Sequence, residues 1–222
     1  LQGKTVLGHV IERVRQSQLI DELIIATTTK ERDSIIVNEA LKCGAKVFRG
    51  SENDVLSRYF YAASEANLDV VIRITSDCPL IDPKILDNVI QFYLKNNYDV
   101  VTNAGIDLST RTYPRGLDVE VFSYKVLEDA FNNAKEIYQR EHVTPYIYEK
   151  SGLVYFFQNA IDYSKYRWTL DTAADFDLIS EIYKNLYHGE HDFYLPEIIE
   201  LFKKMPELYD INSHIKQKEL DK

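Results

Sequence analysis

The chain has little of what marks several protein classes. It contains only two cysteines, Cys43 and Cys78, too few for a disulfide framework, so we expect a reducing, cytoplasmic location. No apolar run approaches the roughly 20 residues that span a bilayer, and the chain opens on no secretory leader, so we expect no membrane partner. The net charge is −9 and no basic run is present, which argues against nucleic acid as a partner.

What is present is a regular alternation in the first half of the chain. Apolar, β-rich runs are separated by segments with helical spacing. The expected strands are 23–27, 45–48, 70–74 and 99–102, and the expected helices are 5–18, 30–43, 53–66 and 82–95. Strands that are apolar throughout and spaced by helices favour a mostly parallel sheet covered on both faces. We therefore predict a single α/β domain over residues 1–222.

The pattern changes in the second half. Residues 118–122 alternate between apolar and acidic side chains, as in an antiparallel or edge strand. Further strands are expected at 153–157 and 166–170. Helices are expected at 124–134 and 139–149, and two more begin at 173 and 195. No linker suggests a second domain.

An aspartate follows the strand that ends at Ile74. In an open parallel sheet, ligands bind outside the carboxyl ends of the strands. Asp82 and Pro83 already provide an N-cap and a first-turn proline for the next helix. Asp77 is left without that role, and hard divalent cations prefer such carboxylates. It is either a metal ligand or an acid in a solvated loop.

A second aspartate stands in the same position before a later helix. Thr172 and Asp175 form a Thr-x-x-Asp capping box, so Asp171, just before the cap, is not needed by the helix. Together, Asp77 and Asp171 form a plausible Mg²⁺ site. Spacing alone leaves the solvated-loop reading open and identifies no reaction.

Other polar segments allow two readings each. The segment 50–58 offers a capping box from Ser51 to Asp54, or a loop that binds a base or phosphate at a helix N-terminus. Asp118 and Glu120 share a strand face, either on a wet edge strand or in a polyol site. Glu141 and His142 read as a helix-surface pair.

Taken jointly, six stretches give the chain a family resemblance. They are residues 3–13, 50–58, 73–82, 111–121, 140–146 and 170–176, in order along nearly the whole chain. The chain resembles the spore coat polysaccharide biosynthesis protein F family, within the cytidylyltransferases that load CMP onto 3-deoxy-manno-octulosonate and sialic-type acids. The resemblance implies a three-layer, Rossmann-like nucleotide-diphospho-sugar transferase fold with a mixed, mostly parallel sheet. The implied reaction joins CTP and an acidic sugar to give a CMP-sugar and pyrophosphate, and a homodimer is implied.

The resemblance also implies roles for individual residues. Asp77 and Asp171 match the two metal-binding, catalytic acids, with Mg²⁺ as the cofactor. The residues implied to contact the nucleotide are Ser51, Asn53, Asp54, Arg58 and Arg73. Those implied to lie near the sugar are Arg115, Asp118, Glu120, Glu141 and His142.

The chain departs from the family at its start. Relatives begin with a strand and a Gly-rich loop whose Arg and Lys hold the triphosphate, and neither precedes Leu1. We expect the natural protein to carry this central strand upstream, and the 222 residues alone to lack part of the catalytic site.

Two other functions remain open. A glycosyltransferase of the same broad fold would usually carry an Asp-x-Asp motif, which Ser76-Asp77-Cys78 lacks. A non-catalytic sugar-nucleotide-binding protein would bind CTP without turnover.

Overall fold

The computed structural model describes residues 1–104 and 110–216. The strands are β1 (Ile24–Thr28), β2 (Lys46–Gly50), β3 (Val70–Arg73), β4 (Val100–Thr102), β5 (Glu120–Ser123) and β6 (Val154–Phe156). The longer helices are α1 (Val6–Val14), α2 (Ser34–Lys42), α3 (Val55–Glu65), α4 (Pro83–Lys95), α5 (Tyr124–Asn133), α8 (Ala173–Leu186) and α9 (Leu195–Lys204). Short helices are α6 (Ile137–His142), α7 (Pro145–Lys150) and α10 (Leu208–Asn212), with a 3₁₀ turn at Glu31–Asp33. Within these described ranges, no helix is long and apolar enough to cross a membrane.

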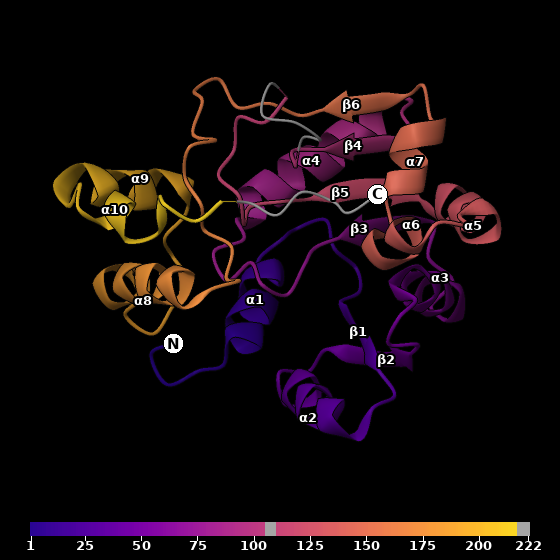
Figure 1. Ribbon diagram of the computed structural model, residues 1–222, viewed down its shortest axis with the longest axis horizontal. Coiled ribbons are helices and arrows are strands. Elements are labelled where there is room, and N and C mark those ends of the chain that lie inside the picture. The colour runs from indigo at the N-terminus through magenta and orange to yellow at the C-terminus, as the bar shows by residue number, and fades with distance from the viewer. Residues whose placement is uncertain (105–109, 217–222) are drawn as a thin grey trace.

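The strands form two sheets (Figure 1). β1 and β2 pair in parallel, and the larger sheet has the order β3-β5-β4-β6. In that sheet β5 is antiparallel to both β3 and β4, while β6 is parallel to β4. Three of its four strands therefore run in one direction, which agrees with the expected mixed, mostly parallel architecture.

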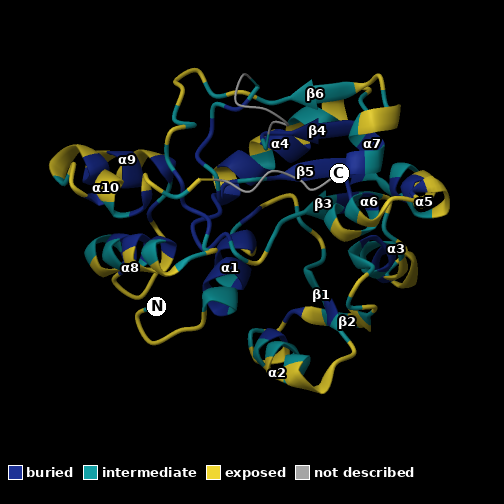
Figure 2. Cartoon of the chain, viewed as in Figure 1, coloured by how far each residue is buried: buried dark blue, intermediate teal, exposed yellow. Residues whose placement is uncertain are grey.

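Helices cover both faces of the larger sheet. Val101 and Val121 are register partners and belong to a core that includes buried residues of α1, α4, α8 and α9. Their neighbours Val100 and Phe122 belong to a second core with buried residues of α3 and α5. Successive side chains of a strand point to opposite faces, so the predicted three layers are present, with β4 and β5 buried between them (Figure 2).

Two expected strands differ from the structure. Of residues 118–122, 120–122 pair in the antiparallel strand β5, but β5 lies inside the sheet between β3 and β4 rather than at its edge. Residues 166–170 make only an isolated parallel bridge, Arg115 to Arg167, because their amides and carbonyls bond to loops instead of a strand partner.

The helix expected at 139–149 is broken into α6 and α7. The break is at Val143, a β-branched residue with φ +73°. Its side chain is fully buried in the core beside α5, so tertiary packing outweighs the local cost of a positive φ. The break also turns Thr144 toward β5, where its hydroxyl donates to Glu120 at 2.8 Å.

A cavity of about 670 Å³ separates the two sheets. It is lined mainly by apolar residues of α1, β1, α3 and β3, among them Ile25 and Val71. Within the described ranges β1 pairs only with β2, and β3 pairs only with β5. The cavity does not show whether a strand lies upstream of Leu1, so the strand implied by the family resemblance stays a prediction.

A buried histidine pair joins α1 to the segment after α8. His9 Nδ1 lies 2.8 Å from His191 Nε2, and both rings are at most 5% exposed. Burial lowers the pKa of His191 to about 4; the charges of Arg13 and His9 act in the same direction, and Glu12 opposes them.

The stability of the fold should therefore depend on pH. His191 is neutral in the folded state and has an ordinary pKa of about 6.5 in the unfolded state. Its full contribution to the free energy of unfolding is therefore present above pH 6.5. It is lost as the pH falls from 6.5 toward 4, by about 2 kcal/mol at pH 5 and about 3 kcal/mol near pH 4. Urea unfolding between pH 7.5 and 5 measures this. His191→Asn should flatten the profile, whereas the same change at exposed His188 should not; equal profiles for all three proteins would contradict the assignment.

Candidate active site

The loop after β3 presents Asp77. As predicted, Asp82 caps α4 by accepting from Lys84 N at 2.8 Å, so Asp77 is not needed there. Instead, its carboxylate accepts from the Thr169 hydroxyl at 3.1 Å, and its carbonyl accepts from Leu170 N at 2.9 Å. These two bonds bring the loop after β3 against the segment that leads into α8.

Asp171 follows directly on that segment. The predicted capping box of α8 is present between Thr172 and Asp175, which leaves Asp171 outside the helix cap. The side chain of Asp171 is 47% exposed, and Arg167 donates to it at 2.5 Å. The structure therefore brings Asp77 and Asp171 to neighbouring segments, with residues 169 and 170 as the link between them.

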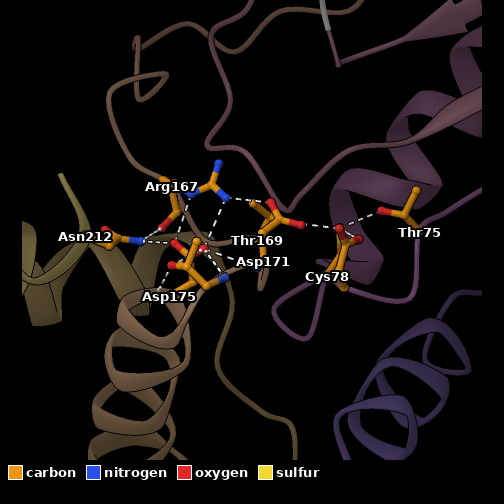
Figure 3. A network of polar contacts seen from close by, with 9 residues as sticks. Thr75, Cys78, Arg167, Thr169, Asp171, Asp175 and Asn212 are labelled. Carbon is orange, nitrogen blue, oxygen red and sulfur yellow. Dashed lines mark hydrogen bonds and ion pairs between the residues drawn. The ribbon is translucent and has the colours of Figure 1, made fainter. Parts of the chain in front are cut away.

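A buried network of Arg167, Asp175 and Asn212 lies beside Asp171 (Figure 3). Arg167 donates from Nε to Asp175 at 2.9 Å and from Nη2 to Asp171. Asn212 of α10 donates to both the Asp175 carboxylate, at 2.8 Å, and the Arg167 carbonyl, at 2.9 Å. Burial acts to raise the pKa of Asp175, but the bonds from Arg167, Asn212 and Asp171 N outweigh it and lower the pKa. No pattern in the sequence pointed to Asn212.

We expect Asn212→Leu to destabilise the protein by about 1–3 kcal/mol, because it leaves the Arg167 carbonyl and one bond of the buried Asp175 unsatisfied. Thermal unfolding measures the loss. Asn133→Leu is the control, since Asn133 is exposed and, among residues 1–104 and 110–216, its side chain bonds only to Asp129 of the same helix. Equal melting temperatures for the two variants would show that the network carries no such stability.

The carboxylate oxygens of Asp77 and Asp171 are ligands of the kind that Mg²⁺ prefers. In the described residues no group of three or more His, Cys, Asp and Glu side chains could hold a metal. Mg²⁺ commonly takes one or two carboxylates and fills its other positions with water and substrate phosphates. Asp77 and Asp171 could supply such a pair without a third acid.

A second group of polar residues lies next to Asp77. Arg111 is 4% exposed and donates to Asp118 at 2.5 Å. Burial raises the pKa of the Cys78 thiol, and the charges of Asp77 and Asp118 raise it further. Cys78 therefore lies near both acids. Arg115 stands on the same segment as Asp118, and its backbone forms the isolated parallel β-bridge with Arg167.

Glu120 and Arg73 are engaged with each other. Arg73 pairs with one carboxylate oxygen of Glu120; the other accepts from Thr144 at 2.8 Å and from Tyr148 at 2.5 Å. This group ties β3, β5 and α7 together. The roles that the family resemblance implies for Arg73 and Glu120 would require them to reach a ligand in addition to these partners.

The loop after β2 is held by arginines. Its expected capping box differs from the structure, because Asp54 itself is the N-cap of α3 and accepts from Ser57 N at 2.9 Å. Arg140 pairs with Asp54, and Arg58 donates to the Ser51 carbonyl at 2.6 Å. Ser51 and Asn53 are exposed on this loop, and their contact with a nucleotide stays a prediction.

Glu141 and His142 lie at the end of α6. Glu141 is exposed and His142 is half-buried. Asp54 also accepts from Arg140, the residue before Glu141. The helix that carries this pair therefore lies against the loop after β2.

Comparison with known proteins gives one consistent result. The model of the family described as cytidylyltransferase matches residues 1–218. An uncharacterised protein of Methanocaldococcus jannaschii is 40% identical over 98% of this chain and 88% of its own length. The spore coat polysaccharide biosynthesis protein SpsF of Bacillus subtilis is 32% identical over 93% of this chain and 87% of its own.

Two solved structures are similar in fold. A cytidylyltransferase from Leptospira borgpetersenii is 34% identical, with a TM-score of 0.86 over 97% of this chain and 89% of that one. The synthetase for CMP-2-keto-3-deoxy-manno-octonic acid, solved with CTP, is 18% identical, with a TM-score of 0.61 over 82% of this chain and 88% of that one.

Proposed function

The chain belongs to the cytidylyltransferase family, and we propose that it transfers CMP from CTP to an acidic sugar for a surface polysaccharide. In this reaction a sugar hydroxyl oxygen forms a bond to the α-phosphorus of CTP. The bond from that phosphorus to the β-phosphate bridging oxygen breaks, pyrophosphate leaves, and the hydroxyl proton passes to solvent. The observation that carries the proposal is the pair Asp77 and Asp171, brought together by the bonds from Thr169 and Leu170 to Asp77.

Different residues of the chain would bind the metal, position its ligands and contact the nucleotide. Asp77 and Asp171 would hold Mg²⁺, which when bound neutralises charge on the phosphates. Arg167 stabilises the position of Asp171, because its guanidinium is itself fixed by buried Asp175. The exposed loop with Ser51 and Asn53 would contact the nucleotide, and its shape is kept by Arg58. Positioning of this kind is the main contribution of a protein to phosphoryl and nucleotidyl transfer.

The acceptor is proposed from the relatives. A 3-deoxy-manno-octulosonate cytidylyltransferase of Chloroherpeton thalassium is 25% identical over 74% of this chain and 58% of its own length. That name supports a sugar acid as acceptor. A panel of sugar acids and neutral sugars with CTP and Mg²⁺, scored by pyrophosphate release, tests the proposal on the full natural protein. Release with sugar acids alone supports it; release of a nucleoside diphosphate from a sugar nucleotide would instead indicate a glycosyltransferase, and CTP binding without turnover a binding protein.

A further inference from the structure

Thr169 connects the two candidate metal acids. It stands two residues before Asp171 on the same segment, and its hydroxyl donates to Asp77 Oδ2 at 3.1 Å. The residue is only 8% exposed, and Figure 3 shows it between the Arg167 network and Cys78. A buried hydroxyl on the segment of one acid is therefore spent on the carboxylate of the other.

The two oxygens of the Asp77 carboxylate have unequal partners. Oδ2 accepts from the Thr169 hydroxyl, whereas Oδ1 accepts from the Cys78 thiol at 3.4 Å. A thiol is a weak donor and a hydroxyl is a full one. The hydroxyl therefore fixes the rotation of the carboxylate through one oxygen, and the lone pairs of the other oxygen stay available for a stronger partner such as a cation.

The backbone that carries this hydroxyl is held on both sides. Trp168 N donates to the Arg115 carbonyl at 2.7 Å, and Leu170 N donates to the Asp77 carbonyl at 2.9 Å. Trp168 is also fully buried in the core. Thr169 itself is β-branched, which restricts its χ1 angle. The hydroxyl therefore reaches Asp77 from a rigid support.

Bonds that orient a ligating carboxylate commonly decide how well it binds a metal, and their removal costs about 10- to 100-fold in affinity or activity. We propose that Thr169 is a positioning residue, whose hydroxyl orients the Asp77 carboxylate and thereby sets the affinity of the site for its divalent cation. This inference rests on the proposed cytidylyl transfer and on Asp77 as a metal ligand. Thr169 itself lies outside the stretches that carry the family resemblance.

The experiment replaces the hydroxyl by a methyl group of nearly the same size, in Thr169→Val. Mn²⁺ binding to the full natural protein without nucleotide, followed by electron paramagnetic resonance, should weaken about 10-fold. The Mg²⁺ concentration for half-maximal pyrophosphate release should rise, and excess Mg²⁺ should restore most of the rate. Thr169→Ser keeps the hydroxyl and should bind Mn²⁺ within about threefold of the unaltered protein. Thr169→Ala also lacks the hydroxyl and takes the place of Thr169→Val if that variant does not fold.

A double variant separates positioning from a general structural effect. Asp77→Ala leaves no carboxylate for the hydroxyl to orient. Adding Thr169→Val to it should therefore change the remaining Mn²⁺ binding, through Asp171, by less than about twofold.

Ser151→Ala is the matched control. Its hydroxyl also donates to a carboxylate, that of Asp99, at 2.7 Å. Asp99 precedes β4 and Asp77 follows β3. Both strands are antiparallel to β5 and so run in the same direction, which places the control at the opposite end of the sheet. Ser151→Ala should leave Mn²⁺ binding unchanged.

The contrary outcomes distinguish this inference from the proposed function. If Asp77→Ala weakens Mn²⁺ binding and Thr169→Val does not, the role of Thr169 is overturned and cytidylyl transfer stands. The same holds if Thr169→Val and Thr169→Ser weaken binding equally, or if Thr169→Val weakens it equally with and without Asp77. If Asp77→Ala binds Mn²⁺ as tightly as the unaltered protein, the metal site itself is wrong and this inference falls with it.

Discussion

Replacement of Asp77 or Asp171 by Asn is expected to lower kcat/KM for CTP by about 100-fold or more. Each change removes one of two carboxylates from the proposed Mg²⁺ site, and metal neutralisation of phosphate charge is worth several kcal/mol in such reactions. Asn keeps the shape, so it can still accept from Thr169 at position 77 and from Arg167 at position 171. The fold should therefore survive and the loss should be chemical. Steady-state pyrophosphate release in the full natural protein measures it.

The matched control is Asp177→Asn, which removes an exposed acid from α8 just beyond Asp171. It should leave kcat/KM unchanged. Mn²⁺ binding followed by electron paramagnetic resonance gives a second readout, in which the two site variants bind more weakly and the control does not. Near-normal rates in both site variants would refute the metal site. A loss of Mn²⁺ binding in the control would show that binding follows the overall negative charge of this region rather than the two proposed ligands.

Gly116→Ala should be the most damaging small substitution in the described chain segments. Gly116 has φ +95°, and an added Cβ would lie 2.5–2.6 Å from backbone atoms of Trp168 and Thr169. A backbone conformation that disfavours side chains and an overpacked contact together cost about 2–4 kcal/mol. At this chain length such a loss lowers the melting temperature by roughly 5–12 °C. Scanning calorimetry measures the shift.

The comparison for this variant is Gly152→Ala. Gly152 has no atom within 4 Å of the position of an added Cβ, so the change should be neutral or slightly stabilising. If Gly116→Ala were as stable as Gly152→Ala, the approach of residues 115–116 to 167–169 would be looser than the distances indicate.

Local patterns predicted much of the fold and part of the site. The caps Asp82 and Thr172 could be read from adjacent residues, because a cap depends only on its own first turn. By assigning them, the sequence showed that Asp77 and Asp171 were not needed by the helices. The prediction that both acids belong to one site came from the family resemblance and from the rule on strand ends. The bonds at residues 169–170 place the two acids on neighbouring segments.

What could not be predicted depends on partners distant in sequence. Asn212 reaches Asp175 across 37 positions, and Glu120 meets Arg73 across 47. The internal place of β5 is a matter of strand order, which the alternation of its side chains does not encode. The break at Val143, by contrast, could have been predicted, because Pro145 lacks the N–H that a continuous helix over 139–149 needs and its ring clashes with the preceding turn.

The cavity between the sheets has a consequence for how the molecule opens. β1, β2 and α2 are held to the rest of the chain by side-chain packing and by hydrogen bonds such as those from Thr5 to Glu39 and from Arg15 to Gly44. Among the described residues no hydrogen-bonded ladder crosses the cavity. Units with few buried contacts open at a lower free energy than the whole protein unfolds. For these 222 residues alone we expect this unit to open by itself while the larger sheet stays folded, and a strand upstream of Leu1 that filled the cavity would prevent it. Because the loop with Ser51 and Asn53 continues from β2, a nucleotide bound to that loop would suppress this opening.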